Sequence, residues 1–382
     1  MNRLGAPASL RAIKRSRAAF RCFDLAQEAI RKRKASPLFF QPAGMRALPG
    51  LARFLIFAFC LLPFAFCLHQ TSAQNRSALL TLFWPNGLET APALRQAGIE
   101  RLAVPSSSVA AWRAAGFDAT PLDEAQREKL LVPRLAGRGS NVASATRRPW
   151  IDANGWRLLR NPKSKFFYDL TGAVPGKAAL AAAEAFAYQA DAIIKLDASE
   201  LPAYGEMLKF LRTLPNEPQA TVADIAVIDD GSPLVGEVMN LLARRNLLFQ
   251  PVKAPLKTAR LNLQLGTKAY PESAASDPSE FALRIRRELG DDHRSLRVYG
   301  AEVVICRLTS DGKTTRLHLL NYSGREVDSL RLKVKGRFEV TAVITFPDGK
   351  QTAAEVAVTD GATEFSLPRL GVYSWVELTT RR

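Results

Sequence analysis

The clearest fold signal in the chain is GKAALAAAEAFAYQADAIIKLD, residues 176–197. Residues 176–190 are rich in alanine and contain no internal helix breaker, which predicts a helix. Residues 191–197 follow directly with β-branched and other apolar side chains, which predicts a buried strand. A strand that follows a helix in this way is typical of parallel sheets with helical crossovers.

The same alternation extends to both sides of this stretch. Before it, the pattern predicts strands at 78–84, 99–105 and 117–122, helices at 89–98 and 107–116, and short strands at 142–145 and in GWRLLR (155–160). After it, the pattern predicts a helix at 199–215, strands at 223–230, 247–254 and 261–267, and helices at 233–246 and 280–290. Most of the chain is therefore expected to be α/β.

From residue 295 the hydrophobic period changes to two, and no helical stretch follows. Asp-Gly pairs at 311–312, 348–349 and 360–361 separate the alternating runs, and this dipeptide favours tight hairpin turns. The sequence therefore predicts a C-terminal antiparallel β-sandwich. His318 falls in one of its alternating strands, where we expect an exposed sheet residue rather than a metal ligand.

The amino-terminal region has the features of a secretory signal. Residues 54–68 form an apolar run that follows arginines, and small residues around Ala73 suit a cleavage point. We expect a leader at 1–44 that is disordered or lies upstream of a true start at Met45, and a signal peptide at 45–73. The mature chain would then be secreted or periplasmic, without a stable membrane span. An uncleaved anchor is the alternative, although the apolar run is short for a span of ~20 residues.

Charge and cysteine content exclude several partners and chemistries. The net charge is +17, and residues 1–73 contribute +10 of it with 12 Lys/Arg against 2 Asp/Glu. The rest is spread without a basic run or interleaved aromatics, which argues against nucleic acid. Beyond the signal only Cys306 remains, and it suits a small buried apolar residue. Few histidines, and no phosphate loop, dinucleotide fingerprint or nucleophile elbow, favour neither a metal nor a cofactor.

Polar and aromatic side chains gather where the predicted strands end. In parallel α/β folds, functional side chains lie beyond the carboxyl ends of the strands. Carboxylate, amide and guanidinium groups bond hydroxyls, and indole rings stack on the apolar face of a pyranose. We therefore predict a carbohydrate site with Asp152 and Asp197 as the catalytic pair, and Glu89 or Asp229 as substitutes. The predicted sugar-binding residues are Trp84, Glu89, Asn154, Trp156, Arg157 and Lys195.

Structural roles are the alternatives for the same residues. Asp197 and Asp229 stand where they could cap the helices that follow them. Trp150 and Trp156 could belong to the core, because an indole ring buries a large apolar area. The density of polar groups in PWIDANGWRLLRNP, residues 149–162, favours function, since buried Asp, Asn and Arg side chains would all need partners.

Several longer segments carry a family resemblance. They are WIDANGWRLLR (150–160), AEAFAYQADAIIKLDASEL (183–201), ADIAVIDDGSPLVGEVMNLLARRNLLF (223–249), RLHLLNYSGREV (316–327) and FSLPRLGVYSWVEL (365–378). In this order they resemble exported glycoside-hydrolase-like proteins such as the beta-galactosidases with a trimerisation domain. The resemblance implies a TIM-barrel-like α/β domain at 74–216, a flavodoxin-like module at 217–292 (or the last barrel strands), and a β-sandwich at 293–382.

The chain departs from a complete barrel of that kind. Residues 74–216 hold about five strand–helix units where a barrel needs eight, so the barrel is either partial or completed by residues 217–292. No predicted strand is followed by the Asn-Glu pair that many such hydrolases carry after a barrel strand. Two hypotheses follow: an exported glycoside hydrolase that acts on oligo- or polysaccharide, and a non-catalytic glycan-binding or assembly protein derived from one. Carbohydrate is the expected partner, and a homo-oligomer is compatible with both.

Overall fold

The computed structural model describes residues 80–132, 137–139, 150–173, 175–300 and 303–381, without the side chains of 137–139 and 150–152. The predicted leader (1–44), the predicted signal peptide (45–73) and the predicted strand at 142–145 lie outside the described residues. Among the helices that are described, none combines the length and the apolar composition needed to cross a bilayer.

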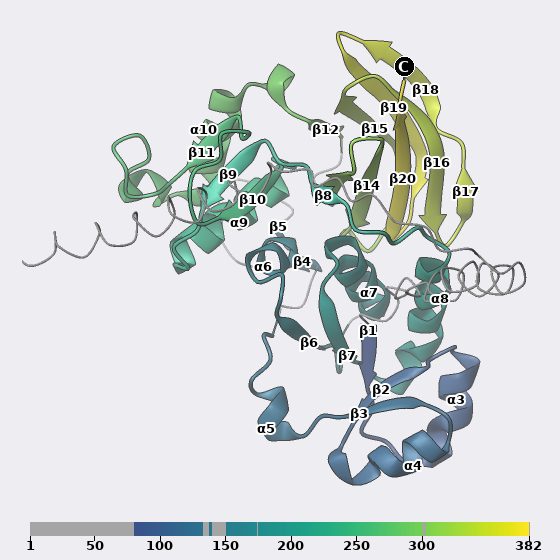
Figure 1. The fold of residues 1–382 in the computed structure, drawn as a ribbon. Helices are drawn as coiled ribbons and strands as arrows, with labels where there is room; N and C mark the ends of the chain where they lie inside the picture. Colours follow the sequence, from purple (N-terminus) through teal and green to yellow (C-terminus); the bar gives the residue numbers. More distant parts are fainter. Residues whose placement is uncertain (1–79, 133–136, 140–149, 174, 301–302, 382) are drawn as a thin grey trace, which may run out of the picture. The chain divides into compact units, whose positions relative to one another are not determined.

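The first part of the structure is built on a five-stranded parallel sheet (Figure 1). Its strands are β1 (Leu80–Phe83), β2 (Arg101–Val104), β3 (Asp118–Pro121), β6 (Lys165–Asp169) and β7 (Asp191–Lys195). They pair in the order β3-β2-β1-β7-β6, and every pairing is parallel. Taken as a ring, the order is 6-7-1-2-3, so a late strand returns to pair with the first strand as it does in a TIM barrel.

The ring is open, because no ladder within the described residues joins β3 to β6. One parallel bridge between Leu131 and Phe166 adds a short contact at the edge of β6 that faces away from β7. The sheet therefore has barrel-like strand order without closure. The predicted fold class, α/β with a partial TIM-barrel-like sheet followed by all-β structure, is confirmed.

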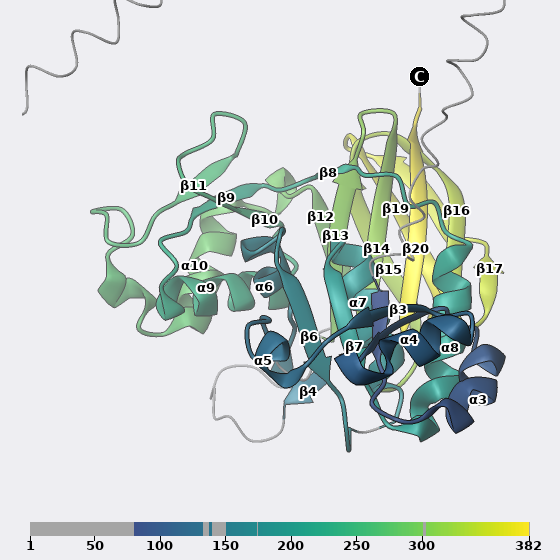
Figure 2. The same ribbon diagram turned by 60° about the horizontal axis from the view of Figure 1, so that its bottom comes forward.

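Helices cover one face of this sheet (Figure 2). They are α3 (Ala91–Gln96), α4 (Val109–Ala114), α7 (Lys177–Tyr188) and α8 (Leu201–Arg212). Strand residues such as Leu82 and Ile194 share a core cluster with helix residues such as Leu94 and Trp112. Nine of the twelve residues of α7 are buried, and seven of those are alanines, which let the helix lie close to the strands. The helix and strand predicted at 176–197 are both present.

The opposite face of the sheet carries a smaller apolar cluster of Ala103, Leu122, Phe167 and Ile193. The Phe83 ring packs edge-to-face on Phe167 with centroids 5.7 Å apart. Side chains two residues apart share one face of a strand, so Asp169 and Lys195 lie on this same face, one step beyond Phe167 and Ile193. In a closed barrel this face would be the interior.

The chain between β3 and β6 forms α5 (Glu124–Arg127), the antiparallel pair β4 (Gly137–Gly139) and β5 (Trp150–Asp152), and α6 (Gly155–Arg160). The segment GWRLLR, which the sequence predicted as a strand, is α6. Its large apolar side chains serve two cores, because Leu158 packs with the parallel sheet and Trp156 with the next module. A helix of six residues that is buried on two sides shows no single apolar stripe, which explains the wrong prediction.

The second module is a three-stranded parallel sheet with two long helices. Its strands pair in the order β10-β9-β11, from β9 (Ile225–Ile228), β10 (Phe249–Val252) and β11 (Leu261–Leu263), and its helices are α9 (Pro233–Arg244) and α10 (Pro278–Leu289). This is the expected flavodoxin-like α/β module. A Cβ at Gly236 of α9 would come within 2.9 Å of the Trp156 ring, so glycine permits the close contact between α9 and α6.

The C-terminal part consists of two antiparallel sheets, ordered β12-β15-β19-β18 and β17-β16-β20-β14-β13-β8. The strands are β8 (Ala220–Thr221), β12 (Leu296–Tyr299), β13 (Val304–Ser310), β14 (Thr314–Asn321), β15 (Val327–Lys335), β16 (Phe338–Phe346), β17 (Gly349–Gln351), β18 (Ala354–Thr359), β19 (Ala362–Leu370) and β20 (Tyr373–Thr380). Gly312, Gly349 and Gly361 have positive φ in the turns that join neighbouring strands. The three predicted Asp-Gly hairpins are confirmed.

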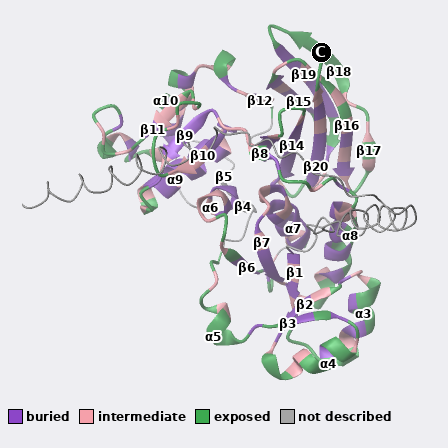
Figure 3. Ribbon diagram, in the orientation of Figure 1, coloured by how far each residue is buried: buried purple, intermediate pink, exposed green. Residues whose placement is uncertain are grey.

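The sandwich shares a core with the parallel sheet (Figure 3). Tyr322, Tyr373 and Trp375 belong to the same apolar cluster as the helices α7 and α8. Short 3-10 helices complete the fold at Leu88–Thr90 (η2), Ser106–Ser108 (η3), Ala198–Glu200 (η4), Glu272–Ala275 (η5) and Asp291–His293 (η6).

Candidate functional site

The carboxyl edge of the parallel sheet brings together charged side chains from neighbouring strands. Asp169 ends β6, Lys195 ends β7, and the two residues are register partners. Lys195 Nζ lies 3.0 Å from Asp169 Oδ2, and both side chains are partly exposed. Phe83, at the end of β1, is the register partner of Lys195 on its other side. An apolar ring therefore stands beside an ion pair on the face of the sheet opposite α3, α4, α7 and α8.

Asp169 is held as a carboxylate. Thr171 donates from its hydroxyl (2.7 Å) and its backbone N–H (3.2 Å) to Asp169 Oδ1. Partial burial acts to raise the pKa of Asp169, but the hydrogen bonds from Thr171 and Lys195 outweigh it, so the pKa is lowered. The group is thus a hydrogen-bond acceptor at neutral pH.

Two further acids follow β7 and fix the loop after β6. The backbone N–H of Gly172 donates to Asp197 Oδ2 at 2.6 Å, and the N–H of Gly176 donates to Glu200 Oε2 at 2.9 Å. Both contacts place carboxylates in acceptor roles at the same edge of the sheet as Asp169.

The ends of β2 and β3 add one more acid. Ser106 donates its backbone N–H to Asp123 Oδ1 at 2.9 Å, and its hydroxyl also bonds Asp123. These hydrogen bonds lower the pKa of Asp123. Asp123 also caps α5 together with Gln126. Within the described residues, no group of three or more His, Cys, Asp and Glu side chains is arranged to hold a metal ion.

The structure does not bring the predicted site residues together in one place. Lys195 and Asp197 lie at the carboxyl edge, as described above. Trp84 is a core residue, 1% exposed, and its indole N–H donates to Thr90 Oγ1 at 2.8 Å. Glu89 is exposed on η2. The backbone of Asp152 ends β5, but its side chain lies outside the described part.

Asn154, Trp156 and Arg157 lie among packed elements rather than at the carboxyl edge. Asn154 is 0% and Trp156 9% exposed, and the Arg157 guanidinium sits over the Trp156 ring at 4.3 Å. The polar density of 149–162 did indicate that buried groups would have partners. The partner of Asn154 is a residue that the sequence reasoning missed, Glu184 of α7.

Glu184 is fully buried and accepts four hydrogen bonds. The donors are the Asn154 backbone N–H (2.8 Å) and side-chain amide (3.1 Å), the Tyr168 hydroxyl (3.1 Å) and the Tyr322 hydroxyl (2.6 Å). Burial raises the pKa of Glu184, and the four donors oppose this rise. The sequence signal for Glu184 is that it is the single acid in an alanine-rich helix.

Asp229, the predicted substitute, is also engaged. It forms a two-pronged ion pair with Arg160, at 3.0 Å from Nε and 2.7 Å from Nη2, and it accepts the Gly231 N–H at 3.0 Å. The pair joins α6 to the loop before α9. Asp229 therefore contributes to the contact between the two α/β parts, while Asp169, which the prediction did not include, stands at the carboxyl edge.

His318 differs from its prediction as an exposed sheet residue. It is 6% exposed, and its Nδ1 lies 2.7 Å from the Tyr373 hydroxyl. Seven of the eight residues of β14 are buried, because β14 lies inside its sheet and α7 packs on it. Alternation along a strand predicts an exposed side only where one face of the sheet meets water.

No family model and no curated protein sequence matches the chain. Among solved structures it is similar to alpha-L-fucosidase isoenzyme 2 from Paenibacillus thiaminolyticus, at 10% identity over 69% of this chain and 68% of that one, with a TM-score of 0.48. It is also similar to a rhamnosidase from Novosphingobium sp. PP1Y (11% identity, 69% and 36% covered, TM-score 0.41). A third is a catalytic mutant of a GH42 beta-galactosidase from G. stearothermophilus (8% identity, 55% and 51% covered, TM-score 0.34).

The chain spans about half of the beta-galactosidase and about a third of the rhamnosidase. All three TM-scores are below 0.5.

Proposed function

We propose that the protein binds a hydroxyl-rich ligand of the carbohydrate class at the carboxyl edge of its open sheet, without hydrolysing it. One observation carries this proposal: the described acids at that edge are placed as hydrogen-bond acceptors. Asp169 and Asp123 have lowered pKa values. A glycosidase needs a second carboxyl that stays protonated to act as the general acid. Acceptors at a sheet edge suit hydroxyl donors instead.

The neighbouring groups support the same ligand class. Lys195 supplies donors beside the Asp169 acceptor, 3.0 Å away, so a sugar with vicinal hydroxyls could bond both. Phe83 is half-buried on the same face, and an aromatic ring gives an apolar surface for the C–H face of a pyranose. Within the described residues no strand joins β3 to β6, so this face lacks the further strands that would close a barrel.

Hydrolysis is the second candidate, and one observation favours it. Asp169 ends β6 and Asp197 lies two residues beyond the end of the neighbouring strand β7, so two carboxylates stand at one edge of the sheet, and a glycosidase needs two carboxyls that flank one bond. In this candidate Asp197 would act together with Asp169 or with Asp152, the partner expected from the sequence.

The test uses chain that begins at Gln74, screened for binding on an array of neutral and acidic glycans and for turnover of aryl glycosides. We expect binding without turnover, and at least tenfold weaker binding for Asp169→Asn and for Lys195→Met, since each removes a charged hydrogen-bonding group. Glu206→Gln, at an exposed position of α8 on the helix-covered face of the sheet, is the matched control. Turnover that disappears in Asp197→Asn would establish the hydrolase instead. Binding to no glycan at all would reject both.

We also propose that residues 45–73 direct export and are removed after Ala73. Expression of the full-length chain in a bacterium, followed by amino-terminal sequencing of the periplasmic and secreted fractions, tests this. A mature start at Gln74 is the expected result. A chain that stays in the cytoplasm with residues 45–73 attached would contradict it.

A further inference from the structure

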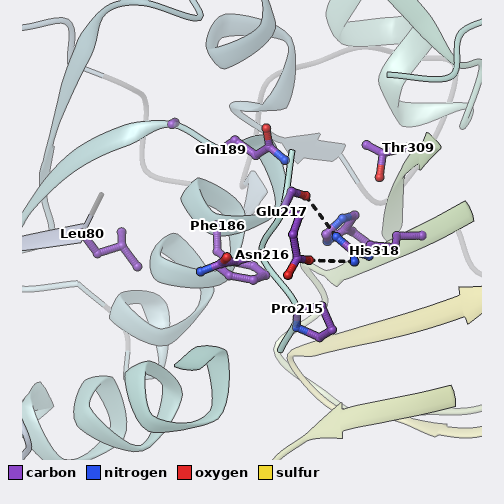
Figure 4. A pocket seen from close by; sticks show the side chains of 10 residues that line it. Leu80, Phe186, Gln189, Pro215, Asn216, Glu217, Thr309 and His318 are labelled. Atoms are coloured by element: carbon purple, nitrogen blue, oxygen red, sulfur yellow. Dashed lines mark hydrogen bonds and ion pairs between the residues drawn. The ribbon is translucent and has the colours of Figure 1, made fainter. Parts of the chain in front are cut away.

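The two sheets of the sandwich have different surroundings. The six-stranded sheet packs on the α/β part, because α7 contacts β14, and Arg316 of β14 donates to the carboxylate and the carbonyl of Glu217 in the segment before β8 (Figure 4). In the four-stranded sheet, the side chains of β15 alternate between the sandwich core and solvent. The solvent side of the four-stranded sheet, here called the outer face, can therefore receive a partner.

Cations gather on the outer face. Arg331, Lys333 and Lys335 of β15 alternate with residues of the sandwich core. Side chains two residues apart share one face of a strand and lie about 6.8 Å apart, so the three cations form a line along β15. Arg297 of β12 is the register partner of Lys333 and stands beside this line.

Two of the guanidinium groups are held on an aromatic ring. The Cζ atoms of Arg297 and Arg331 lie 5.2 Å and 5.7 Å from the centroid of the Tyr299 ring. Stacking of this kind fixes the plane of a guanidinium and leaves its N–H groups for bidentate bonds to a carboxylate. Because both guanidinium groups lie over the ring, it is not open to a sugar ring or a nucleotide base. The outer face therefore suits an anionic ligand.

Acids border the line of cations on both sides. On the side of β19 and β18, Glu364 accepts from Arg331 at 2.6 Å, and Glu355 lies on the outermost strand. On the side of β12, Asp292 lies 3.7 Å from Arg297. The further contacts of these borders are Lys333 with Glu364 (2.8 Å), Ser366 with Glu355 (2.9 Å) and Arg297 with Asp291 (3.8 Å). A broad anionic surface would meet the bordering acids, whereas a single anionic chain along β15 would meet the cations.

The described side chains of the outer face offer little apolar surface. Ala354 and Ala357 of β18 are register partners of outer-face residues of β19. The larger exposed side chains of β18, Val356 and Val358, alternate with Ala357 and so belong to the other face of the strand. A peptide or protein partner would need apolar anchors. Charge without such anchors favours a polysaccharide that carries a carboxylate on each unit.

We propose that the outer face binds an acidic polysaccharide of the polyuronate class. Its carboxylates would bond Arg331, Lys333 and Lys335 in turn, and Arg297 would bond the same chain from the side. The outer face is a different surface from the carboxyl edge, and the proposal does not rest on the function proposed above.

The test is calorimetric titration with polygalacturonate at low and high salt, about 0.05 M and about 0.3 M NaCl. It uses the chain that begins at Gln74, because residues 1–73 carry a net charge of +10 that would attract any polyanion. We expect binding at low salt that is at least tenfold weaker at high salt, since salt screens exposed charges. An absence of binding at low salt would overturn the proposal.

The combined variant Arg331→Gln, Lys333→Gln and Lys335→Gln should weaken binding at least tenfold. The matched control also loses three charges, at exposed lysines on other surfaces: Lys163→Gln, Lys209→Gln and Lys257→Gln. It should weaken binding less than about twofold. Equal losses in the two variants would mean that only net charge matters, and binding that persists in the first would place the polysaccharide elsewhere. Either result would overturn this inference and leave the carboxyl-edge proposal standing.

Two single variants keep the test independent of folding. Lys335→Gln leaves both ion pairs of Glu364 in place, since Lys335 Nζ bonds the Asp292 carbonyl at 3.4 Å, and it should weaken binding about threefold with an unchanged Tm. Glu364→Gln removes a bordering acid and should strengthen binding about twofold, which damage to the fold would not do.

The remaining probes are poly-L-glutamate and vesicles that contain phosphatidylserine. We expect both to bind more weakly than polygalacturonate. Binding of either probe that is as tight as that of polygalacturonate, and that is lost in the same combined variant, would overturn the polysaccharide as the partner.

Discussion

Two acids of the same α/β part, Glu184 and Asp169, have opposite surroundings. Glu184 is fully buried and receives hydrogen bonds from three other segments of the chain, one of them in the sandwich. Asp169 is partly exposed at the carboxyl edge and is held by Lys195 on the adjacent strand and by Thr171, two residues further along the chain. The comparison suggests that the two acids have different roles. The buried Glu184 joins parts of the fold, while the partly exposed Asp169 is available to a ligand.

The largest expected effect is in Glu184→Ala. The substitution leaves the Asn154, Tyr168 and Tyr322 donors buried without their acceptor, so we expect the free energy of unfolding to fall by about 3 kcal/mol or more. Urea denaturation followed by tryptophan fluorescence measures this. Glu89→Ala, at an exposed acid, should change it by less than about 0.5 kcal/mol. If Glu184→Ala lowers the free energy of unfolding by less than about 1 kcal/mol, Glu184 does not join the parts of the fold as proposed.

The second effect concerns the pH dependence of stability and His318, a buried ionisable group of β14 where the sandwich packs on α7. The unfolded pKa of histidine is ~6.5, and in the fold the pKa of His318 is lowered to about 3. Between these values the unfolded chain binds a proton that the folded chain does not, so stability falls as the pH falls. From pH 6.5 to 5 the wild type should lose about 2 kcal/mol more than His318→Gln. His293→Gln, at an exposed histidine, should keep the wild-type slope.

The third effect tests the link between the modules. Tyr322→Phe removes one hydrogen bond to a buried carboxylate, and we expect a loss of about 1.5 kcal/mol in the free energy of unfolding. Tyr299→Phe is the control, because the Tyr299 ring is flanked by Arg297 and Arg331 through its faces. Equal stability of the two variants would mean that Glu184 does not depend on the sandwich.

The smallest effect on stability is expected at the carboxyl edge. The ion pair of Asp169 with Lys195 is partly exposed, with 38% and 25% of the side chains accessible. Asp169→Asn should therefore lower the free energy of unfolding by less than about 1 kcal/mol, although it should weaken glycan binding. Asp118→Asn, which removes an exposed ion pair with Arg101, is the matched control. A large loss of stability in Asp169→Asn would mean that Asp169 stabilises the fold and is not held ready for a ligand.

The sequence predicted those features that local pattern determines. The alanine-rich helix and the strand at 176–197 were correct, and the Asp-Gly turns at Gly312, Gly349 and Gly361 were correct because few other residues adopt their positive φ. The count of strand–helix units left two alternatives, a partial barrel and one completed by residues 217–292, and the described strands β9–β11 form a separate sheet. These inferences required no knowledge of which distant segments meet.

The candidate site was less predictable, because it depends on contacts between segments that are distant in the sequence. The partners of Glu184 come from residues 154, 168 and 322, and no spacing in the chain relates them. Trp84 and Asn154 follow strand or turn patterns that suit a strand-end site, yet packing buries both. Lys195 lies at the end of a strand, as predicted. Its partner Asp169 could be identified only from the register of β6 with β7.

The bond between Tyr322 and Glu184 also bears on how this architecture can be inherited. A chain that ended before the sandwich would lose a donor to a buried charge and would expose the apolar surface that Tyr373 and Trp375 cover. Gene rearrangements that exchange the sandwich alone would thus meet a folding penalty. We expect the parallel sheet and the sandwich to be inherited together as one unit.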